Sequence, residues 1–178
     1  CQRMDGIVDS ILGLARRERA QSEVIDVPRL LRRFVADYAT AHPLGADRLE
    51  ERSPGPLSAV VDPRHLQQVL TVLVDNARAY GRRPGEPARV LLRAAASDGE
   101  GAESGSVDID VLDHGPGIPP SVAGQLFAPF FTTSEHGTGL GLYIARQLCE
   151  ANQGTLRHLP VPAGGACFRI RLPGRAVR

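Results

Sequence analysis

The feature that most constrains this chain is a glycine-rich loop that runs directly into a helix. In the stretch HGTGLGLYIARQLCEANQG, Gly137, Gly139 and Gly141 are followed by apolar residues at helical spacing from Leu140 to Ala151. Such a loop presents free backbone N–H groups and the positive end of a helix dipole, which predicts a phosphate site. Glycine-rich turns also occur without a ligand, so this stretch alone leaves both interpretations open. The G-x-G-x-G spacing, with no βαβ unit around it, argues against a dinucleotide fold.

The rest of the pattern mixes helices and strands without strict βαβ order. Helices are expected after Asp26 and after Asp62, because an early proline follows each acidic cap. The second helix carries an unbroken apolar stripe from Leu66 to Ala77, which is typical of a core helix. Strands are expected over 88–96, over 106–113 with half-buried alternation, and as a hairpin over 154–173. We therefore predict an α+β fold in which helices cover one mixed sheet.

Composition and charge exclude several functional classes. The 178 residues carry a formal net charge of only +1, which gives no basic surface for nucleic acid. Cys1, Cys149 and Cys167 show no C-x-x-C spacing, so we expect reduced thiols without a disulfide or a metal site. There is neither a signal peptide nor a bilayer-spanning apolar run, so the chain as given is expected to be soluble. The seam from Met4 to Leu14 looks like the tail of a long helix, which predicts a piece of a longer protein.

Three separate places in the sequence predict the same ligand. Asn76 lies at the edge of the core-helix stripe, roughly 80° to 100° from its centre, where a side chain can face a cleft. Asp113-x-Gly115-x-Gly117 follows the strand over 106–113, and the glycine loop over 137–142 opens a helix. The order and spacing of these motifs resemble the N, G1 and G2 boxes of sensor histidine kinase catalytic domains.

The resemblance extends over essentially the whole chain. Phe127-x-Pro129-Phe130 resembles the F box, and the N-terminal helix tail looks like the end of the second helix of a dimerisation and histidine-phosphotransfer hairpin. The stretches RRFVADYATAHP and CEANQG look like the sensor kinases that regulate type IV pilus genes. The resemblance implies a Bergerat ATP-binding fold, a two-layer sandwich with three helices on the mixed sheet. Residues 1–22 would end the dimerisation helix, and 23–178 would form the catalytic domain.

The resemblance also implies a function. It implies a kinase domain that binds Mg-ATP, transfers the γ-phosphoryl to a histidine upstream of Cys1, and works with a response regulator that receives the phosphate. Its partners would be its own dimerisation hairpin, in a homodimer, and that regulator, with no nucleic acid. The domain is expected in the cytoplasm of a bacterium, in an inner-membrane-anchored kinase, and would meet the membrane only through missing upstream segments.

The chemistry of ATP gives each implied residue a role. A carboxylate at a strand end, Asp113, can accept a charge-assisted hydrogen bond from the adenine amine, and Gly115 and Gly117 let the backbone approach the base. The amide oxygen of Asn76 suits Mg²⁺, which makes Asn76 the metal ligand and the catalytic candidate. A lid over 119–136, anchored by Phe127 and Phe130, would close over the nucleotide. The implied ATP-binding residues are Asn76, Tyr80, Asp113, Gly115, Gly117, Ile118, Phe130, Gly137, Thr138, Gly139, Leu140, Gly141 and Leu142.

The sequence departs from the family pattern in places that predict a weak nucleotide site. Val72 stands where a second Asn is common, and Ala79 stands where a basic residue is common. Arg78 cannot substitute for the basic residue missing at Ala79, since its side chain points about 100° away around the helix. Cys167 stands where a small hydroxyl residue is expected near adenine. None of the five histidines has an acidic residue after it on a helix, so the phosphoacceptor is expected upstream, and His136 alone is placed to contact the nucleotide.

Other functions remain open on the sequence. A water-activating ATPase resembling gyrase, MutL or Hsp90 needs a general-base Glu four residues before the metal-binding Asn, and Val72 cannot accept a proton. A serine-phosphorylating anti-sigma-factor kinase shares the fold but would lack the dimerisation-helix remnant. A nucleotide-binding or interaction module that has lost catalysis is kept open by Val72 and Ala79.

Overall fold

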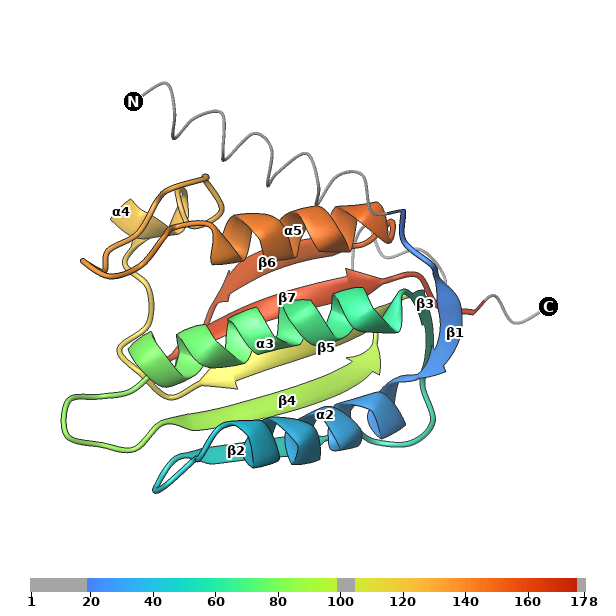
Figure 1. Ribbon diagram of the computed structural model, residues 1–178, viewed down its shortest axis with the longest axis horizontal. Helices are drawn as coiled ribbons and strands as arrows, with labels where there is room; N and C mark the ends of the chain where they lie inside the picture. The colour runs from blue at the N-terminus through green and yellow to red at the C-terminus, as the bar shows by residue number, and fades with distance from the viewer. Residues whose placement is uncertain (1–18, 99–104, 176–178) are drawn as a thin grey trace.

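The computed structural model describes residues 19–98 and 105–175, and these form two layers. Three helices lie side by side on one face of a five-stranded sheet (Figure 1). They are α2 (Val27–Ala41), α3 (Pro63–Tyr80) and α5 (Gly141–Ala151), and a short helix, α4 (Pro120–Ala123), precedes the glycine loop. The predicted helix tail over Met4–Leu14 lies outside the described residues. No helix within the described ranges is long and apolar enough to cross a bilayer.

The sheet is mixed, which confirms the predicted α+β class. Its strand order is β2-β4-β5-β7-β6, and only the β2–β4 pair is parallel. A separate antiparallel pair, β1–β3, lies at the other end of the helices from the glycine loop (Figure 1). The strands are β1 (Glu23–Asp26), β2 (Arg48–Arg52), β3 (Ser58–Val61), β4 (Arg89–Ala96), β5 (Val107–Asp113), β6 (Thr155–Pro160) and β7 (Ala166–Leu172).

The central helix α3 forms where the sequence predicts it. Asp62 caps it through a hydrogen bond from the Arg64 N–H to Oδ1 at 3.0 Å, and Pro63 takes the first position, where a missing N–H costs nothing. The whole apolar stripe from Leu66 to Ala77 is buried against β4, β5 and α5. Burial of each large side chain contributes roughly 1.5–3 kcal/mol, so this stripe anchors the helix that carries Asn76.

Arg78 points away from the edge of α3 that carries Asn76, as its helical position predicts. Its Nε donates to Asp47 Oδ2 at 2.9 Å, and one of its terminal nitrogens donates to the backbone oxygen of Pro43 at 3.2 Å. Asp47 Oδ1 in turn accepts the backbone N–H of Ala88 at 2.9 Å. Arg78 therefore fastens the end of α3 to the turn before β2, which Asp47 links to the start of β4, and its role is structural.

Strand β5 differs from the prediction, because it is buried on both faces. Val107, Ile109 and Val111 face the helices as expected. The two alternate residues, Asp108 and Asp110, are only 4% and 3% exposed although no helix of the described ranges covers that face of the sheet. The alternation predicted correctly which face of β5 packs on the helices. It predicted wrongly that the opposite face is exposed to solvent.

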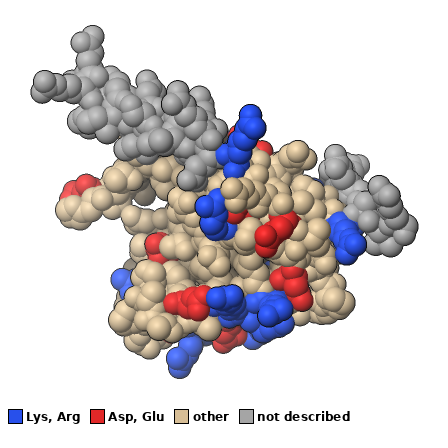
Figure 2. Space-filling model, turned by 45° about the vertical axis from the view of Figure 1, so that its right-hand side comes forward, with Lys and Arg blue, Asp and Glu red and all other residues tan. Residues whose placement is uncertain are grey.

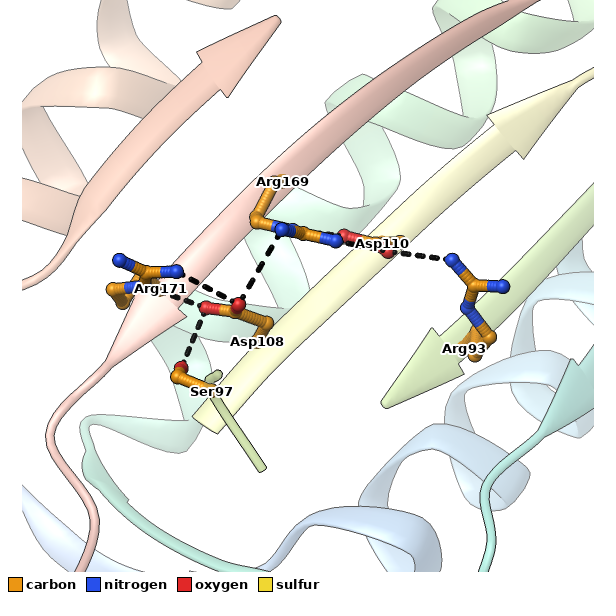
Figure 3. Close-up of polar contacts among 6 residues, drawn as sticks. All are labelled: Arg93, Ser97, Asp108, Asp110, Arg169 and Arg171. Atoms are coloured by element: carbon orange, nitrogen blue, oxygen red, sulfur yellow. Dashed lines mark hydrogen bonds and ion pairs between the residues drawn. The ribbon is translucent and has the colours of Figure 1, made fainter. Parts of the chain in front are cut away.

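Arginines from the neighbouring strands cover these two aspartates (Figure 3). Arg169 donates to both oxygens of Asp110, at 2.7 and 2.9 Å, and Arg93 donates to the same carboxylate at 3.0 Å. Arg171 holds Asp108 in the same two-pronged way, at 2.7 and 2.9 Å. Burial alone would raise the pKa of Asp108, but the hydrogen bonds from Arg171 and Ser97 lower it below the usual value. These ion pairs cover the outer face of β5.

Candidate nucleotide-binding site

Two adjoining cavities open beside the C-terminal half of α3. The first, which we call the apolar cavity, has a volume of about 390 Å³. It lies between α3, the end of β5, the start of β7 and the segment around α4. It is lined by Asn76, Ala77, Tyr80, Gly81, Val111, Asp113, Gly117, Ile118, Pro119, Val122, Leu126, Thr133, Leu142, Ala166 and Phe168.

The second cavity, which we call the glycine cavity, also has a volume of about 390 Å³. Six residues line both cavities, among them Asn76, Tyr80 and Leu142, so the two form one continuous hollow. The glycine cavity is lined by Asn76, Tyr80, Val122, Leu126, Phe131, Thr132, Thr133, His136, Gly137, Thr138, Gly139, Gly141 and Leu142. The predicted residues Gly115, Phe130 and Leu140 line neither cavity.

Asp113 is the acidic group of the apolar cavity. Its Oδ1 accepts the backbone N–H groups of Gly115 and Ala166, both at 3.0 Å. Within the described part of the chain, no donor reaches its Oδ2. Burial raises the pKa of Asp113 above the usual value even though both backbone N–H groups favour the charged form. The side chain is thus fixed in orientation and keeps one oxygen for a donor from outside the protein.

The positions around Asp113 require glycine because neighbouring atoms leave no room for a Cβ. A Cβ on Gly81 would lie 2.4 Å from Asp113 Oδ2, and a Cβ on Gly115 would lie 2.5 Å from the carbonyl carbon of Gly81. Gly165, with a φ of +85°, would place a Cβ 2.1 Å from the Asp113 backbone oxygen. Gly115 was expected to admit the base, but it packs on the end of α3. Of the two predicted G1 glycines, only Gly117 lines the cavity.

The glycine loop is also constrained by its own backbone. Gly139 has a φ of +71°, and a Cβ there would lie 2.4 Å from the carbonyl carbon of Phe130. Gly139 also accepts the Phe130 N–H at 2.9 Å. The N–H of Gly137 donates to Ser134, whereas the N–H groups of Gly139 and Gly141 have no acceptor among the described residues. The loop therefore needs its glycines without a ligand, and still presents backbone donors at the N-terminus of α5.

Comparison with known proteins decides the family. Residues 61–176 match the family model described as histidine kinase-, DNA gyrase B-, and HSP90-like ATPase. The chain belongs to this family. The matched stretch contains every residue that lines the two cavities, so the hollow lies within the ATP-binding domain that defines the family.

Within this ATPase family, the chain is similar to sensor histidine kinases. It is 36% identical to the sensor protein kinase PilS of Pseudomonas aeruginosa, over 95% of this chain and 31% of PilS, which confirms the subgroup resemblance. Full-length ShkA, solved in complex with AMPPNP, is 29% identical with a TM-score of 0.74, over 97% of this chain and 36% of ShkA. The mycobacterial sensor histidine kinase MprB is 28% identical with a TM-score of 0.68, over 87% and 99% of the two chains. The chain spans from 25% to 44% of the length of the first three curated relatives.

The lid segment of this sensor-kinase domain is anchored by one phenylalanine rather than two. Phe127 packs edge to face on Phe168, with ring centroids 6.2 Å apart, and the Arg146 guanidinium lies 5.4 Å from the centre of the Phe127 ring. Phe130 is 48% exposed and has a φ of +65°. The prediction that its ring anchors the lid is wrong, because its backbone holds the Gly139 loop while its ring points outward.

The structure also shows where two other departures from the kinase pattern, Cys167 and Val72, lie. Cys167 was expected beside the base, but strand alternation turns it to the uncovered face of the sheet, and Ala166 and Phe168 line the apolar cavity instead. Val72 lies beside the N-terminus of α5, since a Cβ on Gly141 would be 3.3 Å from its Cγ1. The hydrocarbon side chain of Val72 therefore lies at the start of α5 and lines neither cavity, at a position where the family commonly has an amide.

The sequence missed most of the apolar lining of this ATPase site. Val111 and Phe168 follow from the alternation of β5 and β7, which places every second residue on the helix face. Val122, Leu126 and Thr133 come from an irregular segment with no periodicity, so no local signal marks them. Their place in the wall depends on how the lid folds back over α3.

Proposed function

We propose that this chain is the catalytic domain of a two-component sensor histidine kinase, which binds Mg-ATP and transfers its γ-phosphoryl to a histidine upstream of the chain. The observation that carries the proposal is the position of Asp113. A carboxylate with one unused oxygen lies at the end of an apolar cavity, and a glycine loop lines the next cavity. This arrangement matches the two ends of ATP, an aromatic base with a donor amine and a chain of phosphates.

The adenine base fits the apolar cavity chemically. Its ring would pack among aliphatic and aromatic side chains such as Val111, Ile118 and Phe168, and its amine would donate to Asp113 Oδ2. The two backbone donors on Oδ1 prevent the carboxylate from turning away. The same contact excludes guanine, whose corresponding oxygen would meet the carboxylate charge.

The phosphates would lie in the glycine cavity. Gly139 and Gly141, whose N–H groups have no acceptor among the described residues, line this cavity together with Thr138 at the N-terminus of α5. Asn76 lines both cavities from α3, and its amide oxygen would be a ligand of Mg²⁺. Bound Mg²⁺ would neutralise charge on the phosphate oxygens during transfer.

The reaction itself needs a nucleophile that this domain does not supply. The bond between the γ-phosphorus and the β–γ bridging oxygen breaks as a bond from phosphorus to the imidazole nitrogen forms, and ADP leaves. The domain contributes positioning and charge neutralisation. We infer that the acceptor lies on the dimerisation hairpin of the parent protein and that a response regulator takes the phosphoryl next. The kinase ThkA, which has this fold, has been solved in complex with the response regulator TrrA.

A transfer assay with γ-labelled ATP tests the proposal. The chain is expected to bind ATP, to remain unlabelled alone, and to label a separately supplied histidine hairpin of its own parent protein. The stereochemical reason is that in-line transfer requires a histidine at near-attack distance, and the described histidines lie outside an acid-flanked helical context. An acid-labile, base-stable label on the chain alone would contradict the proposed division between acceptor and catalytic domain.

A second function, a nucleotide-binding module without catalysis, is favoured by one observation. Val72 puts a methyl group beside Gly141 at the start of α5, and Ala79 is an exposed alanine that offers no charge. A module of this kind would bind ATP with equal affinity in Mg²⁺ and in EDTA, and would leave the hairpin unlabelled. Calorimetric titration of ATP under both conditions separates the two functions.

A further inference from the structure

A second hollow lies at the same end of the sheet as Asp113, outside the nucleotide cavities. It consists of two adjoining cavities, of about 320 and about 490 Å³, which share Pro87, Arg89 and His114. Gly81 lines both this hollow and the apolar cavity, so the two lie back to back. The outward-facing residues of β2 and β4 form its floor, on the side of the sheet opposite helices α2, α3 and α5. We call it the arginine groove, after Arg48, Arg52, Arg82, Arg83 and Arg89.

The arginine groove carries charge that the protein does not neutralise. Five arginines face two acids, Glu50 and Glu86, which leaves a formal charge of +3 on a chain whose total is +1. Among the described residues only Arg52 has an ion pair, with Glu50 at 3.1 Å. On the middle of the same sheet face, by contrast, the arginines are paired with Asp108 and Asp110 (Figure 3). On the face drawn in Figure 2, basic and acidic side chains are interspersed.

The chemistry of the arginine groove selects its ligand. Each guanidinium can hold a carboxylate through two parallel hydrogen bonds, and Pro87 and Leu91 add apolar surface between the charges. None of its lining residues is Phe, Tyr or Trp, so the groove lacks the large aromatic rings typical of nucleic-acid binding. The exposed large apolar side chains, Val24, Tyr80 and Phe130, lie elsewhere, so nothing beside the groove would insert into a bilayer.

We propose that the arginine groove docks an acidic segment of a partner protein, in which carboxylates alternate with small apolar residues. Charge complementarity supports this occupant, because four arginines without ion pairs converge on one concave surface. An extended segment fits the shape, since the groove continues from the β6–β7 turn at Gly164 across Arg89 to Arg48 on the edge strand. This interaction is separate from ATP binding and adds a partner surface to the kinase domain.

Direct binding of a model peptide tests the proposal on the full chain. The probe is a fluorescent twelve-residue peptide that alternates Glu with Ala, and the comparison peptide alternates Lys with Ala. The glutamate peptide is expected to bind with an affinity that falls steeply as salt rises, while the lysine peptide does not bind. The double variant R83E/R89E is expected to lower the affinity by about tenfold or more. The matched control R29E/R32E changes the same charge on the exposed face of α2 and is expected to bind like the wild type.

Several outcomes would overturn the proposal. These are the absence of glutamate-peptide binding, an equal loss in R29E/R32E, and binding to phosphatidylglycerol vesicles that R83E/R89E abolishes. Thermal unfolding and ATP titration of R83E/R89E check that the fold and the nucleotide site are intact, since neither arginine lines the nucleotide cavities. A failure of ATP binding in the wild type would instead contradict the proposed kinase function and leave the peptide result unaffected.

Discussion

At the scale of single residues, Asp113 is used for binding. In Asp113→Asn, the amide oxygen still accepts from Gly115 and Ala166, but the charge is lost. ATP affinity is expected to fall about tenfold or more, because a hydrogen bond to a charged acceptor contributes roughly 1.5–3 kcal/mol.

Burial raises the pKa of Asp113, so the contribution of this side chain to stability is lost as pH rises through the folded pKa. The free energy of unfolding at neutral pH should therefore be unchanged or higher, as measured by urea denaturation beside ATP calorimetry.

The matched control for that variant is on the same strand. Asp110 faces the opposite side of the sheet, where Arg93 and Arg169 hold it. Asp110→Asn is expected to lower the free energy of unfolding by roughly 1–3 kcal/mol, because Arg93 and Arg169 lose a buried, charged acceptor, and to leave ATP affinity unchanged. If a folded Asp110→Asn lost as much ATP affinity as Asp113→Asn, the adenine contact would not be the cause.

Asn76 is a second single residue whose role can be tested, since its side chain lines both cavities. In Asn76→Ala, ADP is expected to retain part of its affinity through the base, while the difference between titrations in Mg²⁺ and in EDTA disappears. The reason is that the amide is the proposed oxygen ligand of the ion. A persistent Mg²⁺ dependence would assign the ion to another oxygen.

At the scale of elements, the end of α5 contains a strained residue. Gln153 has a φ of +58°, and its N–H and that of Gly154 donate to Glu150 and Cys149, which is a Schellman helix ending. Glycine adopts this conformation without steric cost. Gln153→Gly is therefore expected to raise the free energy of unfolding by roughly 0.5–1 kcal/mol, as measured by urea denaturation. Gly154→Ala is the opposite control, since its Cβ would lie 2.4 Å from the Arg171 oxygen, and it should destabilise the domain.

At the scale of the whole molecule, a buried polar junction joins the far ends of α3 and α5 (Figure 1). Asn152, at the end of α5, accepts the N–H of Asp62 at 2.7 Å. Asp62 Oδ2 accepts the N–H of Gln21, just before β1, at 2.9 Å. The junction holds three segments that are far apart in sequence and fixes the angle between the two helices that frame the nucleotide hollow.

This junction makes stability depend on pH. Burial alone would raise the pKa of Asp62, but hydrogen bonds from Gln21 and Arg64 lower it from 3.8 to about 2. A depressed folded pKa means that the stabilisation is present above about pH 4 and is lost as pH falls toward 2; its size is about 2 kcal/mol. The difference in unfolding free energy between wild type and Asp62→Asn should therefore shrink between pH 5 and pH 2 in urea denaturation. A constant difference over that range would contradict this assignment.

The sequence by itself determined most of the elements and suggested the main site residues. The caps at Asp26 and Asp62, the stripe of α3 and the alternation of β7 are local patterns, because each depends on contacts within a few residues. The same is true of the edge position of Asn76 and of Asp113 at a strand end. These signals sufficed for the α+β class, for the ATP-binding family and for ten of the 22 residues that line the nucleotide hollow.

Only the tertiary structure decided which surfaces those residues meet. The register of β5 on β7 places Asp110 opposite Arg169 and Asp108 opposite Arg171, and a shift by one residue would move every side chain to the other face. The same register puts Ala166 rather than Cys167 beside the base cavity. The path of the lid segment over 119–136 decided that Phe127 packs on Phe168 and that Phe130 is exposed. Such contacts join residues far apart in the chain, so their energies depend on how the layers pack and no local pattern records them.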